Sequence, residues 1–151
     1  MPSTEARVLI VEDNDALRVM LFTVLRHQPL TVDTASTADE ALEKVTTCDY
    51  ALILIDMDLH SGDAWRFLRD FREARPGANS FVLAVRDPRK NEALDAAGVN
   101  AIMTKPLEID TLAEVIRECA LVVPPPDDPL ECPSAESNYH PQMDGGSQLA
   151  N

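Results

Sequence analysis

The sequence predicts an α/β fold in which a parallel sheet carries helices on both faces. Short apolar runs alternate with stretches of helical periodicity, which is typical of repeated strand–helix units. The connections between them are short, as in sheets whose parallel strands are joined by right-handed crossovers. Charged residues follow several of the apolar runs, at the edge where such sheets bind their ligands.

The predicted strands are rich in β-branched and aliphatic residues, as expected of a buried parallel sheet. The segment LTVDTA alternates instead, like a half-buried strand. The run YALILI is apolar throughout, so we expect it to be the central strand. In chain order the predicted strands are residues 7–12, 30–35, 50–55, 81–85 and 101–104.

Helix start and stop signals lie between these strands. Asn14 or Asp15 can cap a first helix, and Thr37 with Glu40 makes a capping box for a second. Asp63 is predicted to cap a third helix, which ends before a Pro-Gly pair. The last two predicted helices span residues 88–98 and 108–120.

Composition argues against several kinds of function. The net charge of −13 disfavours nucleic acid or an anionic membrane as partner, because both require a basic face. No segment reaches the roughly 18 apolar residues of a membrane helix, and the N-terminus lacks a secretory signal. We therefore expect a cytoplasmic protein, in which Cys48, Cys119 and Cys132 are buried or unreactive thiols.

The composition changes at Val123. Residues 123–151 hold six of the eleven prolines and no Lys or Arg. Such a segment cannot bury enough apolar area to offset its ordering entropy. We expect a folded domain over residues 5–122, followed by a disordered, acidic, proline-rich tail over residues 123–151.

Charged residues follow three of the predicted strands. The first strand ends in Glu12 and Asp13, the third ends in Asp56, and Lys105 lies at the end of the fifth. Close carboxylates repel one another unless a cation lies among them, and Mg²⁺ accepts carboxylates while bridging to phosphate oxygens. The domain lacks a glycine-rich phosphate loop. If the protein handles phosphate, it must therefore do so with a metal such as Mg²⁺ and with Lys105, and an aspartate can then act as the nucleophile.

The segments VLIVEDN, LILIDMDLHSGDAW and LDAAGVNAIMTKPL, with their spacing, resemble the receiver domain of two-component response regulators over residues 7–120. The resemblance implies a flavodoxin-like (βα)5 sandwich with sheet order 2-1-3-4-5. It implies that Asp56 accepts a phosphoryl group, that Lys105 contacts the phosphate, and that the Lys105–Pro106 peptide is cis. The implied Mg²⁺ ligands are Glu12, Asp13, Asp56 and the backbone carbonyl of Asp58. We interpret the side chain of Asp58 as an exposed loop group.

Three positions depart from the family pattern, and one of them is His60, where the family usually has a proline after the acceptor strand. The fourth strand usually ends in a Thr or Ser that binds the phosphoryl group, and here that position is Ala84, or Val85 if the alignment gap is misplaced. The aromatic partner usual on the last strand is Ile102. Phosphate acceptance is therefore expected, but the usual readout through these switch positions is not. In the family the surface near the fourth strand meets partners, and its basic residues here are Arg86, Arg89 and Lys90.

The leading hypothesis is a stand-alone receiver. It would take a phosphoryl group on Asp56 from a histidine kinase or a phosphotransfer protein and act on a downstream protein by contact. It would not be an enzyme beyond its own phosphorylation and dephosphorylation.

Two alternatives stay open. Ala84 and Ile102 suggest a pseudo-receiver, a binding module that phosphorylation does not switch. A haloacid-dehalogenase-type phosphatase also has a strand followed by DxD. That family places its DxD on the first strand, however, whereas Asp56 and Asp58 follow the third.

Overall fold

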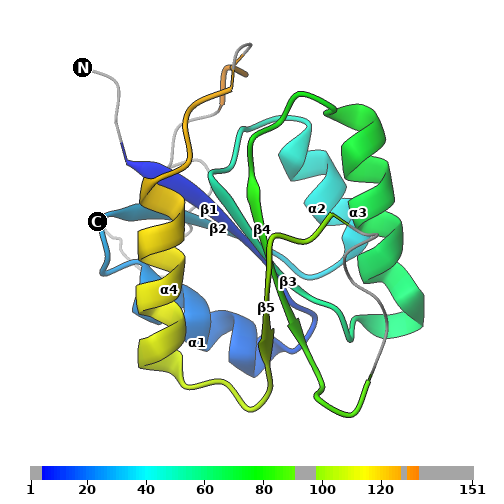
Figure 1. Cartoon of the computed structure of the whole chain (residues 1–151), viewed down its shortest axis with the longest axis vertical. Coiled ribbons are helices and arrows are strands. Elements are labelled where there is room, and N and C mark those ends of the chain that lie inside the picture. The colour runs from blue at the N-terminus through cyan, green and yellow to red at the C-terminus, as the bar shows by residue number, and fades with distance from the viewer. Residues whose placement is uncertain (1–4, 91–97, 127–128, 133–151) are drawn as a thin grey trace, which may run out of the picture.

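The computed structural model describes residues 5–90, 98–126 and 129–132. These residues form a five-stranded sheet of order β2-β1-β3-β4-β5, in which every pairing is parallel. Helices flank the sheet on both faces (Figure 1), so the predicted fold class and sheet order are confirmed. The strands are β1 (Ala6–Val11), β2 (Leu30–Ala35), β3 (Leu52–Asp56), β4 (Phe81–Arg86) and β5 (Ala101–Thr104).

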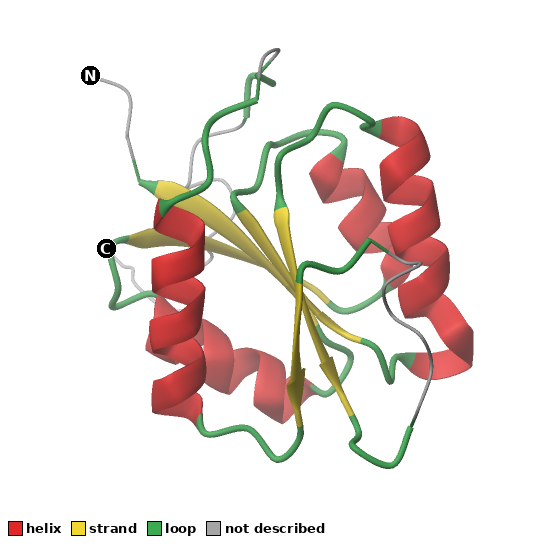
Figure 2. Cartoon of the chain, in the orientation of Figure 1, coloured by secondary structure: helices red, strands yellow, loops and turns green. Residues whose placement is uncertain are grey.

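The described helices follow the strands as predicted (Figure 2). They are α1 (Asp15–Leu25), α2 (Ala38–Val45), α3 (Asp63–Ala74) and α4 (Ile109–Leu121), with a 3-10 turn η1 (His60–Gly62) before α3. The helix predicted within residues 88–98 falls largely on residues outside the described ranges. None of the helices in the described part of the chain is both long and apolar enough to span a membrane.

The helix starts confirm two predictions and correct one. Asn14 caps α1 by accepting a hydrogen bond from the backbone N–H of Leu17. Thr37 caps α2, and Glu40 reaches back to the N–H of Ser36, one residue earlier than a standard capping box. Asp63 is the first residue of α3 and not its cap. That position belongs to Gly62, whose φ of 72° favours glycine.

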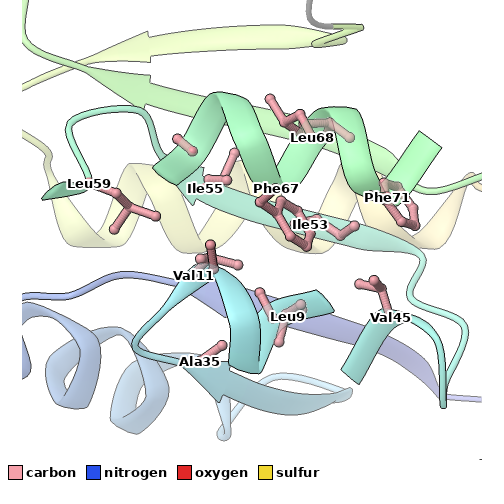
Figure 3. Close-up of a cluster of buried hydrophobic side chains, with 14 of the residues drawn as sticks. Leu9, Val11, Ala35, Val45, Ile53, Ile55, Leu59, Phe67, Leu68 and Phe71 are labelled. Carbon is pink, nitrogen blue, oxygen red and sulfur yellow. The ribbon is translucent and has the colours of Figure 1, made fainter. Parts of the chain in front are cut away.

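Two apolar clusters hold the helices to the sheet. One lies between the sheet and helices α2 and α3, and it contains Phe67, Leu68 and Phe71 of α3 together with Ile53 and Ile55 of β3 (Figure 3). The other lies under α1 and α4 and contains Leu52 and Leu54, which alternate with Ile53 and Ile55 along β3. Because successive strand residues point to opposite faces, β3 is buried on both sides. A strand buried in this way fixes the position of Asp56 at its carboxyl end.

The segment after α4 lies against the amino ends of the strands. Asn79, which precedes β4, donates a side-chain hydrogen bond to the carbonyl of Pro125 at 3.1 Å. The N–H of Leu130 donates to Asp49 at 2.6 Å. Cys132 forms a disulfide with Cys48, 84 residues earlier.

These contacts change two expectations. Of the predicted disordered tail, residues 123–126 and 129–132 are held against the domain, while the remainder lies outside the described residues. The prediction of three unpaired thiols is wrong for Cys48 and Cys132, and Cys119 is the free cysteine. The physical reason is that the chain after α4 returns past the loop that follows α2, which the spacing of the cysteines does not reveal.

The disulfide should stabilise the fold, because it closes a long loop and so restricts the unfolded chain. We predict that Cys132→Ser lowers the free energy of unfolding by about 2–4 kcal/mol without reductant. Chemical denaturation with and without a dithiol measures this. Cys119→Ser, which removes only the free thiol, should have a much smaller effect. Equal stability of Cys132→Ser and wild type under non-reducing conditions would contradict the prediction.

Candidate functional site

Acidic side chains meet at the carboxyl ends of the two central strands. Glu12 follows β1, and its backbone N–H continues the sheet by donating to the carbonyl of Ala35 at 3.0 Å. Asp56 is the last residue of β3. Both carboxylates are buried, with Glu12 4% and Asp56 5% exposed. The parallel sheet therefore brings together two buried acids that lie far apart in the sequence.

Asp13 completes the group. One carboxylate oxygen from each of Glu12, Asp13 and Asp56 lies within 4.8 Å of the others, and Asp13 is the exposed member. Burial raises the pKa of Glu12 to about 8. The hydrogen bond from the N–H of Asn14 lowers this pKa, whereas the charge of Asp56 raises it further. A divalent cation would offset both the burial and the repulsion. The three predicted side-chain ligands thus meet, and the cluster is consistent with the Mg²⁺ site of a receiver.

Lys105 places a positively charged side chain beside these acidic residues. Its Nζ lies 3.1 Å from each carboxylate oxygen of Asp56 and 3.1 Å from Oδ2 of Asp58. Burial of the ammonium opposes its charge, but hydrogen bonds to Asp58 and Asp56 outweigh burial and raise the pKa of Lys105. The Lys105–Pro106 peptide is cis, as the resemblance implied.

The side chain of Asp58 differs from its interpretation as an exposed loop group. Its carboxylate is 16% exposed and faces Lys105 and Lys90. Oδ2 also accepts a hydrogen bond of 2.9 Å from the backbone N–H of Asp87. Burial opposes the charge, but the two lysines outweigh it and lower the pKa of Asp58. These contacts leave no signal in the sequence, because Asp87 and Lys90 lie on another loop.

The strand register distinguishes the two candidates for the switch position on β4. Val85 pairs with Asp56, whereas Ala84 pairs with Ile55. Val85 lies in the cluster under α1 and α4, and Ala84 lies in the cluster under α2 and α3. Val85, the second candidate, is therefore level with Asp56.

Ile102, the predicted switch position on β5, pairs in register with Ala84 and is 40% exposed. Val85 pairs instead with Met103. Neither Ala84 nor Val85 offers a hydroxyl to the site. The departure of these strands from the family pattern therefore persists whichever β4 residue is aligned with the usual Thr or Ser.

The basic residues predicted to meet partners lie where β4 ends. Arg86 is the last residue of β4 and is half-buried. Arg89 forms an ion pair with Asp87, and Lys90 lies 3.3 Å from Asp58. Arg89 and Lys90 are thus engaged with neighbouring carboxylates. The assignment of these three residues to a docking surface stays a prediction.

Known proteins share this arrangement of elements. Residues 8–117 match the family model of the response regulator receiver domain. The KDP operon transcriptional regulatory protein KdpE of Escherichia coli is 35% identical over 112 residues, which is 73% of this chain and 49% of KdpE. The two-component response regulator PhoP of Pseudomonas aeruginosa is 32% identical, over 70% of this chain and 48% of PhoP. The chain spans about half the length of these curated relatives.

Solved structures show the same fold. A CheY-like response regulator receiver domain protein from Methanospirillum hungatei matches with a TM-score of 0.66 and 27% identity, over 78% of this chain and 94% of that one. The response regulator TrrA from Thermotoga maritima, solved in complex with Mg²⁺ and BeF, matches with a TM-score of 0.64 and 20% identity, over 76% of this chain and 98% of that one. At that identity the second likeness concerns the fold alone. From the family match over residues 8–117, together with the sheet order, the chain belongs to the response regulator receiver domain family of two-component signal transduction.

Proposed function

We propose that this domain accepts a phosphoryl group on Asp56 from a phosphohistidine of a histidine kinase or a phosphotransfer protein. One observation carries the proposal: Asp56 is buried at the end of the central strand, with acidic neighbours on one side and the Lys105 ammonium 3.1 Å away. Such a carboxylate is held in place as a nucleophile, with a positive charge ready for the incoming phosphate.

The transfer uses groups already in position. A carboxylate oxygen of Asp56 attacks the phosphorus atom, the bond from phosphorus to the imidazole nitrogen of the donor breaks, and that nitrogen leaves with the electron pair. Lys105 neutralises a phosphoryl oxygen as a point charge. Water later attacks the acyl phosphate, which releases inorganic phosphate and restores the Asp56 carboxylate.

Mg²⁺ would neutralise charge on the phosphoryl oxygens during transfer. The residues that would hold it are Glu12, Asp13, Asp56 and the backbone carbonyl of Asp58. The positions of Glu12 and Asp56 support this assignment, because a carboxylate oxygen of each lies within 4.8 Å of one from Asp13. Among the described residues, the ammonium of Lys105 alone pairs with Asp56, so negative charge is in excess.

The output is proposed to be a change in protein contacts. The hypothesis of a stand-alone receiver stays a prediction, since the match spans only about half the length of the curated relatives. The pseudo-receiver alternative is favoured by one observation, the aliphatic side chains of Ala84, Val85 and Ile102 where the family usually carries its switch residues. It differs from the main proposal in a measurable way: a phosphoryl mimic would bind without moving the ends of β4 and β5.

We predict that acetyl phosphate with Mg²⁺ adds one phosphoryl group to the protein, and that Asp56→Asn abolishes the addition because an amide is not a nucleophile here. Intact-protein mass spectrometry measures the adduct. Asp63→Asn, the same substitution at the start of α3, is the matched control and should be phosphorylated normally. A wild-type protein that stays unmodified, or an Asp56→Asn variant that gains the same mass, would refute the proposal.

Lys105→Ala should slow phosphorylation by about tenfold or more, because one charge-assisted contact to the phosphoryl group is lost. The initial rate of adduct formation with acetyl phosphate measures this effect. Lys44→Ala, on α2, is the control, since Lys44 contacts Thr34 and Glu40 and not the acidic cluster. An unchanged rate in Lys105→Ala would remove Lys105 from the proposed mechanism.

The pKa of Glu12 predicts how Mg²⁺ binding depends on pH. Between its ordinary value of 4.5 and about 8, folded Glu12 keeps a proton that the unfolded chain has released. Without metal, stability therefore falls as the pH rises through this window. Since Mg²⁺ must displace that proton, the increase in melting temperature caused by Mg²⁺ should be larger at about pH 8.5 than at about pH 6.

Glu12→Gln tests the origin of this effect. The substitution removes the titrating group, so the gain from Mg²⁺ should become smaller and nearly independent of pH. Thermal melts of both proteins with and without Mg²⁺ provide the comparison. The same pH dependence in Glu12→Gln as in wild type would show that Glu12 is not the group that Mg²⁺ deprotonates.

A further inference from the structure

Asp58 connects three separate parts of the domain through one carboxylate. It lies just after β3, and its own N–H donates to Oδ1 of Asp56 at 2.9 Å. Its Oδ2 meets Lys105, which follows β5, at 3.1 Å and the N–H of Asp87, which follows β4, at 2.9 Å. Its Oδ1 lies 3.3 Å from Lys90. The carboxylate thus links the neighbourhood of Asp56 to residues 87–90.

The sheet does not provide this link. The backbone ladder at the end of β4 stops at Arg86, whose carbonyl accepts from the N–H of Lys105 at 2.9 Å. Beyond it, Arg89 contacts Asp87 within the same turn. Among the hydrogen bonds and ion pairs of the described residues, those that join residues 87–90 to the rest of the domain end on Asp58. Val85, level with Asp56 on β4, has no polar side-chain atom to do so.

Lys105 is shared between Asp56 and Asp58 at equal distance. Each of the two carboxylates lies 3.1 Å from its Nζ. A phosphoryl group carries about −1.5 to −2 charges at neutral pH, more than the carboxylate of Asp58. Phosphorylated Asp56 would therefore draw Lys105 away from Asp58 and at the same time repel the Asp58 carboxylate. Because Asp58 is only 16% exposed, solvent screens these forces weakly.

We propose that Asp58 is a positioning residue that transmits phosphorylation of Asp56 to residues 87–90. It does so because it loses its ion pair with Lys105 when Asp56 becomes phosphorylated. The inference rests on the proposed phosphorylation and extends it. Loss of Lys105 leaves Asp58 held by Lys90 and by the N–H of Asp87 alone. A displacement of the carboxylate then moves the Asp87 backbone with it, because the two are joined by a direct hydrogen bond. Lys90 contributes less, since its side chain is 52% exposed.

The test follows the amide resonance of Asp87 by NMR as Mg²⁺ and beryllofluoride, a phosphoryl mimic, are added. Wild type should show a clear shift of this resonance. Asp58→Asn keeps an acceptor for the Asp87 N–H but removes the charge that competes for Lys105, so the shift should fall by about half or more. Asp63→Asn is the matched control, because it removes an equal charge at the start of α3, where Asp63 pairs with Arg66. It should respond as wild type does.

Two further measurements separate transmission from simple structural support. Lys90→Gln keeps the contacts of Asp58 with Lys105 and Asp87, so its Asp87 shift should remain close to that of wild type. Asp58→Asn should also react about three- to tenfold faster with acetyl phosphate, since Lys105 is no longer shared and one repelling charge is gone. A purely structural role for Asp58 would not accelerate this reaction.

The outcomes distinguish this inference from the proposed function. If wild type forms no adduct, the proposed function fails and this inference fails with it. If wild type forms the adduct but Asp58→Asn shows the full Asp87 shift and an unchanged rate, the inference alone is overturned. A reduced shift together with the faster reaction, both absent in Asp63→Asn, would support it.

Discussion

The site depends on the burial of two carboxylates at the carboxyl edge of the sheet beside a single ammonium. The ends of β1 and β3 force Glu12 and Asp56 together, and both are at most 5% exposed. Like charges so placed stay ionised only with a cation nearby, and burial together with the charge of Asp56 raises the pKa of Glu12 although Lys105 lowers it. The excess of negative charge is consistent with the Mg²⁺ site of a receiver domain, and it underlies the proposal that Asp56 accepts phosphate.

The same ammonium also ties the site to its surroundings. Lys105 is divided between Asp56 and Asp58, and Asp58 holds the backbone of Asp87. In a site where β4 offers no hydroxyl, this chain of ion pairs and hydrogen bonds connects Asp56 to the loop after β4. The disulfide lies apart from it. Cys48 precedes β3, so the segment closed by Cys132 is anchored near the amino ends of the strands, opposite the acidic cluster.

Much of the fold could be predicted because apolar periodicity and capping residues are local properties. All five strands and their order were predicted, and Glu12, Asp13, Asp56 and Lys105 meet as expected because parallel strands end at one edge. What was missed depends on contacts between distant loops. The direction of the Asp58 side chain is set by Asp87 and Lys90, and the pairing of Cys48 with Cys132 by the return of the chain after α4. Which of Ala84 and Val85 corresponds to the family's Thr or Ser stays a prediction, because the register shows only that Val85 is level with Asp56.

Asp56, and no other carboxylate of the cluster, is proposed to become an acyl phosphate. Borohydride reduces an acyl phosphate to an alcohol, which converts the modified aspartate into homoserine. After treatment with acetyl phosphate and Mg²⁺, reduction and peptide mass spectrometry should find homoserine at position 56 alone. Homoserine at position 13 or 58, or in no peptide of a protein treated under conditions that phosphorylate a known receiver, would contradict this account of the site.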